Sequence, residues 1–331
     1  MKKIFVMAAM VLGVSAAYAG DSEPLKAITK SKTYAEAEAL LNSTLDQLAS
    51  PQEKAKAYNK LYELSIKDFE TVSAVIAENQ KAAVMKTDQK AYDTASYYKS
   101  AYNAVKAAVE CDKYDGQPDA KGKVKIAYRK DEVRLQKLMQ ARLELVNAGQ
   151  WIDGKNDESG LLKYWGLFLN SRNTSLFEKL PKEPFLGQVA FYAGAYAERA
   201  GQFEQADKYF DIAMQDPEWA EKAQNAKFEV AGKNLKTQAD TLRYIGQLKE
   251  LYTQKNSEVA FSVLCKLYSS SNMTKDLNAL VEDMLKKNPK NFLALAYHTQ
   301  AVADSVSRQE ENQNWDAAIE AYKALLEASD G

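Results

Sequence analysis

The side chains that most often do chemistry are few in this sequence. His298 is its one histidine, and Cys111 and Cys265 are its two cysteines. A serine–histidine–acid triad needs a histidine beside its nucleophile, and a zinc site needs several nitrogen, sulfur or carboxylate ligands. The sequence also lacks the H-E-x-x-H, G-x-S-x-G and Gly-rich phosphate-loop motifs. We therefore expect no such centre and no cofactor, and we interpret His298 as a structural residue.

Carboxylates are the remaining catalytic groups, because the chain has 45 Asp and Glu residues beside 19 Tyr, 11 Phe and 4 Trp. A glycoside hydrolase uses two carboxyl groups that face each other across the sugar. Here the acids have the spacing of solvated helix faces, as in Glu36 and Glu38 or Glu198 and Glu204. The prediction is therefore a protein that is not an enzyme. The alternative is a carbohydrate-handling helical protein, either a glycan-binding protein or a carboxylate-based glycoside hydrolase.

The two cysteines leave two interpretations open. In an oxidising compartment they could form a disulfide. In an elongated chain, however, residues so far apart in sequence would also lie far apart in space, which favours two small buried helix residues.

The elements that hold these residues are expected to be helices. Of the 331 residues, 46% are hydrophobic and 27% are charged, which is enough apolar material for a core. Only 14 Gly and 7 Pro are present, whereas an all-β chain needs many turns. Ala, Leu, Lys, Glu and Gln, all good helix formers, dominate the composition. We therefore predict an all-α protein.

Residues 1–19 have the composition of a signal peptide. Lys2 and Lys3 precede an apolar segment over 4–14, and Ala17-Tyr18-Ala19 is a small-x-small cleavage site. The apolar segment is too short for a membrane anchor. We therefore expect cleavage after Ala19 and a periplasmic or secreted protein without a membrane anchor. The net charge of −1 offers no electrostatic attraction for nucleic acid.

The stretch 188–217 is the clearest helical hairpin in the sequence. It reads as two amphipathic helices joined by a turn at 200–202. Gly194, Ala197 and Gly201 would form a shallow groove on the first helix. Ala206, Phe210 and Ala213 would form the ridge of the second helix that enters this groove.

Further helices are expected on both sides of this hairpin. Apolar residues recur at helical spacing over 31–49 and 51–69, and a helix over 72–85 follows, with a break near Lys67 and Asp68. The segment 112–123 has no apolar periodicity and is the predicted internal boundary. We accordingly divide the mature chain into an N-terminal helical region with degenerate repeats, 20–130, and a repeat region, 131–331. An insertion around 310–311 is expected before the last helix.

Three of the C-terminal units share parts of one motif. The unit 258–291 reads Phe261-x2-Leu264-Cys265-x2-Tyr268, then Leu277-x3-Val281, then Pro289; the unit 187–217 has Ala206-x3-Phe210, and the last has Trp315 and Ala318-x3-Tyr322. This pattern resembles that of tetratricopeptide repeat (TPR) proteins, over 187–328 and more weakly over 31–171. The resemblance implies stacked helical hairpins in a right-handed α-α superhelix, whose first helices line a concave groove.

The same resemblance implies that the groove binds a protein or a peptide. The groove positions that we select are Gln188, Tyr192, Glu198, Arg199, Lys266, Tyr297 and Gln300. Because these residues are mixed and partly aromatic, an apolar or extended partner segment would suit them. The opposing interpretation is that Phe191 and Tyr192 pack against the preceding helix, 158–171, and bind nothing. The function expected from the sequence is an exported scaffold that binds a protein partner.

Overall fold

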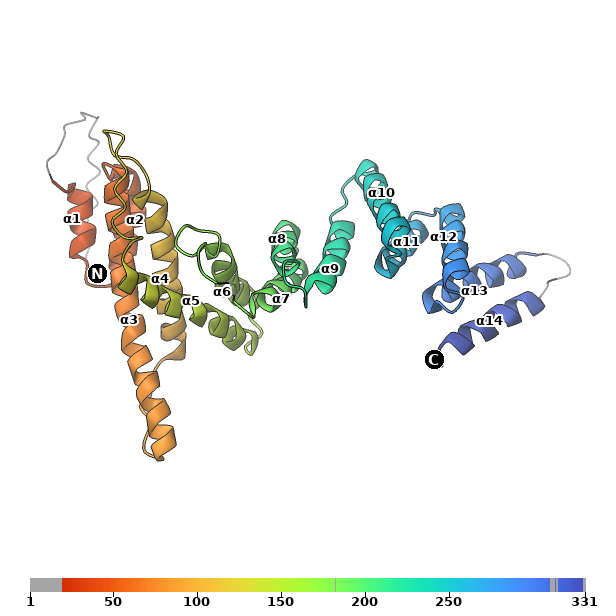
Figure 1. Ribbon diagram of the computed structural model, residues 1–331, viewed down its shortest axis with the longest axis horizontal. Helices are drawn as coiled ribbons and strands as arrows, with labels where there is room; N and C mark the ends of the chain where they lie inside the picture. Colours follow the sequence, from red (N-terminus) through yellow and green to blue (C-terminus); the bar gives the residue numbers. More distant parts are fainter. Residues whose placement is uncertain (1–19, 182, 310–312, 314, 330–331) are drawn as a thin grey trace, which may run out of the picture. The chain divides into compact units, whose positions relative to one another are not determined.

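The computed structural model describes residues 20–181, 183–309, 313 and 315–329, so the predicted signal peptide and the 310–311 insertion lie outside the described residues. Within these ranges the chain forms fourteen α-helices and one short 3-10 helix, and the β-structure amounts to an isolated bridge between Pro118 and Val124 (Figure 1). The prediction of an all-α protein is confirmed. The chain divides into two compact units, Met1–Glu183 and Pro184–Gly331. The predicted boundary at 112–123 lies inside the first unit.

Over residues 20–181 and 183 the first unit contains six α-helices and the 3-10 helix. They are α1 (Glu23–Lys30), α2 (Tyr34–Thr44), η1 (Leu45–Gln47), α3 (Pro51–Met85), α4 (Thr94–Asp115), α5 (Glu132–Asp153) and α6 (Glu158–Ser171). The most extensive packing in this unit is that between α3 and α4. Ser50 caps the start of α3 by accepting a hydrogen bond from the Glu53 amide, and Pro51 takes the first turn, where its missing N–H costs nothing.

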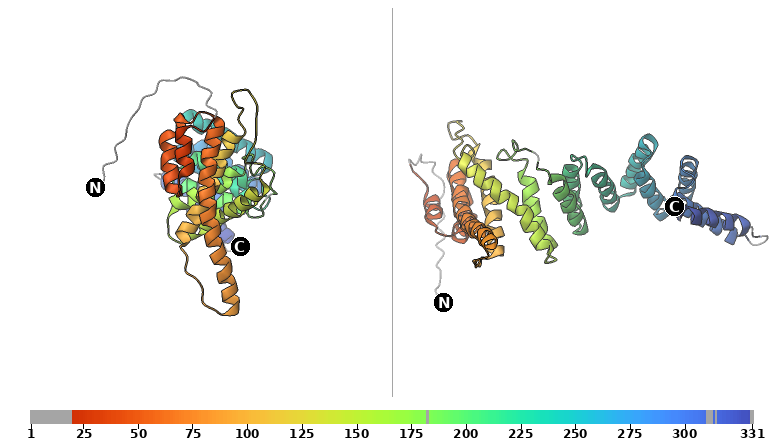
Figure 2. Two further views of the ribbon diagram at one scale, coloured as in Figure 1. Left: turned by 90° about the vertical axis from the view of Figure 1, so that its left-hand side faces the viewer. Right: turned by 60° about the horizontal axis from the view of Figure 1, so that its bottom comes forward.

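The expected break near Lys67 and Asp68 is wrong, because α3 runs through it as one 35-residue helix. Both residues are exposed, so this polar pair belongs to the solvent face of the helix. The C-terminal part of α3 projects beyond its neighbours (Figure 2). There the Asn79 side chain binds the backbone N–H and C=O of Lys90, both at 2.7 Å, and so ties the returning chain to the helix.

A buried ion pair closes the first unit. Arg142 on α5 is 1% exposed and forms an ion pair with Glu183, while its guanidinium donates to Ser171 Oγ and to the Phe168 carbonyl, both at 3.0 Å. The guanidinium carbon also lies 4.1 Å from the centre of the Phe168 ring. These contacts join α5, α6 and the segment after α6, so that the buried charge is paired and hydrogen-bonded as its environment requires.

The second unit contains eight helices among its described residues. They are α7 (Leu186–Arg199), α8 (Phe203–Ala213), α9 (Ala220–Lys233), α10 (Gln238–Lys255), α11 (Glu258–Ser270), α12 (Thr274–Lys287), α13 (Phe292–Ser307) and α14 (Trp315–Ser329). The hairpins α7–α8 and α13–α14 are well packed. In contrast, α9 packs mainly on α8 and α10 mainly on α11, so the contact between α9 and α10 is slight.

The hairpin predicted at 188–217 is present, and its turn lies between Arg199 and Phe203 as expected. Ala206, Phe210 and Ala213 are fully buried. A methyl group added at Gly194 would lie 2.5 Å from Cε1 of the Phe210 ring, closer than side chains approach in folded proteins. The first unit has the same kind of contact, because a methyl group at Gly149 would overlap the indole ring of Trp165. In each case an aromatic ring occupies the space that a glycine leaves open.

The buried positions of α7 recur in α11. They are Val189, Ala190, Ala193, Gly194 and Ala197 in α7, and Ala260, Phe261, Leu264, Cys265 and Tyr268 in α11. The spacing is the same in both helices, which therefore turn equivalent faces toward the interior. Both cysteines are buried and free, so the structure favours the second interpretation of these residues.

The contact between Gly194 and Phe210 predicts opposite effects for two glycine-to-alanine substitutions. We expect Gly194→Ala to destabilise the second unit by about 1–3 kcal/mol, because the ring must move. Gly246, in the exposed interior of α10, has no atom within 4 Å of an added methyl group. There Gly246→Ala should stabilise the helix by about 1 kcal/mol. Denaturant unfolding followed by circular dichroism measures the change in the free energy of unfolding for each variant. If both substitutions stabilise the protein, or both destabilise it, the packing described here is contradicted.

The burial of the cysteines predicts two unreactive thiols. Desolvation raises the pKa of Cys111 and of Cys265 to about 12, so at pH 8 almost none of either is the reactive thiolate. We expect a disulfide reagent such as DTNB to label neither thiol in the native protein and both after unfolding. Rapid labelling of the native protein, or the absence of thiols after unfolding without reductant, would contradict this expectation.

Candidate functional site

The residues predicted to line a groove lie on three helices of the second unit. Gln188, Tyr192, Glu198 and Arg199 are on α7, Lys266 is on α11, and Tyr297 and Gln300 are on α13. Helical spacing places Gln188, Tyr192 and Arg199 along one side of α7, and all three are exposed. The α7 set is thus brought together, whereas the other positions belong to separate elements.

Tyr192 is the member of this set whose contacts with neighbouring side chains are best defined. Its side chain is 43% exposed, and its ring meets Phe191 and Trp219 edge to face, with ring centres 5.6 Å apart in both pairs. Phe191 is partly buried beneath it, with its ring centre 5.1 Å from that of Trp219 and 5.9 Å from that of Phe210. We call Phe191, Tyr192 and Trp219 the aromatic patch. Its three rings contact one another, and Phe191 links them to the buried Phe210 of the hairpin core.

A lysine adds positive charge to the aromatic patch. Trp219 lies at the start of α9, and the ammonium group of Lys222, one turn later, is 4.7 Å from the centre of its indole ring. This cation–π contact holds a charged donor beside an exposed apolar surface. Neither Trp219 nor Lys222 was among the groove positions selected from the sequence. The spacing of three residues between Trp219 and Lys222 could have indicated their contact, because it places both side chains on one side of a helix.

The charged end of the predicted groove is largely engaged in internal contacts. The Glu198 carboxylate forms a 2.5 Å ion pair with Lys233 of α9, and its side chain is only 14% exposed. The Arg199 guanidinium lies 4.2 Å from the centre of the Tyr196 ring. Glu198 therefore helps to hold α9 beside α7, while Arg199 presents its charge at the surface.

The remaining groove positions differ in how far their side chains are exposed to a binding partner. Lys266 is exposed on α11. Gln300 is exposed and donates a 2.8 Å hydrogen bond to Asp304 on the next turn. Tyr297 packs against the buried cluster around Phe261 and Leu264, and burial, followed by the neighbouring Cys265, raises the pKa of its phenol. Tyr297 is therefore chiefly a packing residue.

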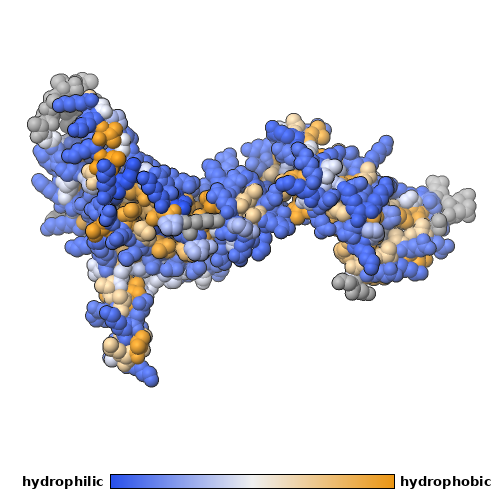
Figure 3. Space-filling view, viewed as in Figure 1, coloured by the Kyte–Doolittle hydropathy of each residue, from blue (hydrophilic) through white to orange (hydrophobic). Residues whose placement is uncertain are grey.

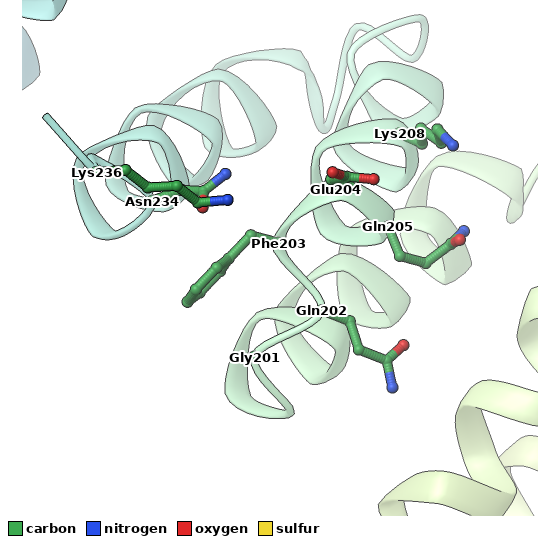
Figure 4. Close-up of a pocket in the computed structure, with 8 residues that line it drawn as sticks. All are labelled: Gly201, Gln202, Phe203, Glu204, Gln205, Lys208, Asn234 and Lys236. Carbon is green, nitrogen blue, oxygen red and sulfur yellow. The ribbon is translucent and has the colours of Figure 1, made fainter. Parts of the chain in front are cut away.

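A hollow of about 400 Å³ lies beside the α7–α8 turn. Eight residues line it, namely Gly201, Gln202, Phe203, Glu204, Gln205, Lys208, Asn234 and Lys236. In Figure 4, Phe203 lies on the side of Asn234 and Lys236, whereas Gln202 and Gln205 point the other way. With one carboxylate among its lining residues, this hollow lacks the facing pair that a glycosidase needs.

A second hollow, of about 480 Å³, lies in the first unit between α2, α3 and α4. Serine and threonine side chains dominate its polar lining, and Ser65 at its floor is 1% exposed with an unpaired hydroxyl group. Asp68 is the one carboxylate among the eleven lining residues. This hollow can offer hydrogen bonds to a polar molecule but again has no pair of carboxyl groups.

The carboxyl groups with displaced pKa values do not behave as general acids. Hydrogen bonds and charge from lysines lower the pKa of Glu78 and Asp283, and hydrogen bonds to Ser96 lower that of Asp93. A general acid near neutral pH needs the opposite shift. In the described ranges no three His, Cys, Asp or Glu side chains come together as metal ligands would. Nor does any helix found there combine the length and apolarity needed to cross a membrane.

Comparison of the chain with protein-family models and with curated proteins finds no match.

Proposed function

We propose that this protein is an exported scaffold that binds a segment of another protein at the α7 surface centred on the aromatic patch. The observation that carries the proposal is Tyr192, a large aromatic side chain that stays 43% exposed while its neighbours hold its ring in place. Aromatic residues fixed before binding lose little conformational entropy, and they dominate the energetics of protein interfaces.

The partner that suits this surface is an extended or helical segment with apolar side chains and an acidic group. The apolar side chains would cover Tyr192 and Trp219, and the acidic group would face Lys222, which places positive charge beside the Trp219 ring. Arg199, exposed at the end of α7 over the Tyr196 ring, would add positive charge there. This combination follows interface anatomy, in which an apolar centre is surrounded by polar contacts. The engaged Glu198 would hold α9 beside α7 without contributing contacts of its own.

The TPR-like architecture and the export belong to this proposal. The recurrence of the buried positions between α7 and α11 supports equivalent repeat units, and a right-handed superhelix would place the first helices of the units along one groove. The composition of residues 1–19 supports a cleaved signal peptide and a periplasmic or secreted protein. A carbohydrate ligand, the alternative, would also stack on exposed rings, so the experiment must distinguish the two.

A photo-reactive amino acid at position 192, introduced into the full chain in its native cells, tests the proposal. Leu242 is the matched control position, because it is 55% exposed on α10 of the same unit. We expect a protein adduct from position 192 and none from position 242. Adducts of equal yield at both positions, or binding on a glycan array without any protein adduct, would reject the proposal.

With the cross-linked partner in hand, the side-chain contributions can be measured. We expect Tyr192→Ala and Trp219→Ala each to weaken binding about thirtyfold, the loss of about 2 kcal/mol that marks an interface hot spot. Arg199→Ala should weaken binding by a smaller factor than the two aromatic substitutions. Because the charge of Arg199 is exposed, this loss of affinity should be larger at low salt than at high salt. Leu242→Ala should leave the affinity unchanged. Isothermal titration calorimetry gives these values.

A further inference from the structure

The hollow of the first unit lies at the start of α2. Thr33, Tyr34 and Ala35, which are the N-cap and the first two residues of that helix, line one part of it. Residues of α3 and α4 line the rest. Its volume of about 480 Å³ falls in the range of small-molecule sites. We call this space the α2 hollow.

The start of α2 brings unpaired hydrogen-bond donors to the hollow. The Thr33 hydroxyl group accepts a hydrogen bond from the Glu36 amide. Within the described chain, the amides of Tyr34 and Ala35 have no acceptor, as is usual in a first helical turn. The ammonium group of Lys99 on α4 is exposed at the same hollow and forms no ion pair with any described residue. Two free amides at the positive end of a helix, beside an ammonium group, are suitable donors for a carboxylate.

The opposite charge at the hollow comes from Asp68 on α3. Its carboxylate is exposed and, over the residues that the structure describes, takes part in no ion pair or hydrogen bond. The hydroxyl groups of Thr71 and Ser100 donate to carbonyls of their own helices, so their oxygens remain able to accept. An ammonium ion has three donors and no acceptor, so these groups suit it.

The floor of the hollow contains a buried hydroxyl group without a partner. Ser65 on α3 is 1% exposed, and its hydroxyl group forms no hydrogen bond with the described residues. Burial without a hydrogen bond is unfavourable, and a polar ligand in the hollow would supply the missing partner. Blue, hydrophilic residues cover most of the face drawn in Figure 3, so exposed charges alone distinguish no site. The buried hydroxyl group is what sets this hollow apart.

We propose that the α2 hollow binds a small zwitterion, namely a free α-amino acid. The ligand carboxylate accepts hydrogen bonds from the amides of Tyr34 and Ala35 and faces Lys99, while the ligand ammonium group donates to Asp68 and to nearby hydroxyl oxygens. A simple anion would be repelled by Asp68, and a neutral sugar would leave both charges unmatched. The site belongs to the first unit and is independent of the protein-binding surface proposed on α7.

Calorimetric titration of the full chain with each standard amino acid tests this proposal. We expect at least one of them to bind. Its N-acetyl derivative, which lacks the ammonium group, and its amide, which lacks the carboxylate, should each bind at least tenfold more weakly, because a polar group of the site is then left unpaired. Binding of no amino acid, equal binding of the blocked derivatives, or tighter binding of phosphate or glucose would overturn the proposal.

Substitutions at the hollow assign the two ends of the ligand. Asp68→Asn should weaken binding of the amino acid at least tenfold and leave that of its N-acetyl derivative unchanged. Lys99→Gln should weaken binding of the amino acid and leave that of its amide unchanged. Lys67→Gln is the matched control, because it removes the same charge from an exposed residue outside the hollow, and it should change no affinity more than about twofold. Amino acid binding that survives the first two substitutions would place the ligand elsewhere and reject the proposal.

Ser65→Ala should affect stability and binding in opposite directions. Removal of an unpaired buried hydroxyl group should raise the melting temperature of the free protein, whereas loss of its hydrogen bond to the ligand should weaken binding severalfold. A lower melting temperature of the free variant, or an unchanged affinity, would contradict a ligand at this hydroxyl group.

Discussion

In two helix pairs of this protein, α5–α6 and α7–α8, an aromatic ring lies directly against a glycine and sets how closely the helices approach. Phe210 occupies the space above Gly194 in the second unit, and Trp165 occupies that above Gly149 in the first, where its indole N–H also donates a 3.1 Å hydrogen bond to the Val146 carbonyl. A ring that replaces a missing side chain lets two backbones approach closely and still fills the interface.

The surface proposed to bind a partner depends on this interior packing. Phe210 lies against Gly194, Phe191 rests on Phe210, and Trp219 rests on Phe191, which leaves Tyr192 as the outermost ring. The order of these rings explains how an exposed aromatic side chain can be rigid without a buried anchor of its own. Functional side chains need such support, because a loosely held ring loses more entropy when it binds.

Local signals in the sequence sufficed to predict the helical class, the 188–217 hairpin and the place of Gly194 in its contact, since periodicity and turn residues act within a few positions. Gly201, which was assigned to the same groove, is instead the exposed turn residue with a φ of 72°, and no atom lies within 4 Å of a methyl group added there. The continuity of α3 was missed because two consecutive polar residues, Lys67 and Asp68, resemble a helix break in the sequence. In the structure both lie on the solvent face of an unbroken helix. Tertiary pairs were also beyond local patterns: Lys233 neutralises Glu198 from 35 positions away, which removes a predicted groove residue from the free surface. Of the four α7 positions, Gln188, Tyr192 and Arg199 have the exposure that was expected of groove residues.

The ion pair of Arg142 has a consequence for where the first unit can end. Its counter-ion, Glu183, follows 41 residues later and is the last residue of the first unit. A guanidinium group cannot enter an apolar interior unpaired, since its desolvation would cost several kcal/mol. Ser171 and the Phe168 carbonyl on α6 accept hydrogen bonds from Arg142, but its counter-charge comes from residue 183 alone among the contacts described for it. A first unit that ended before residue 183 would therefore hold a buried charge without its counter-ion.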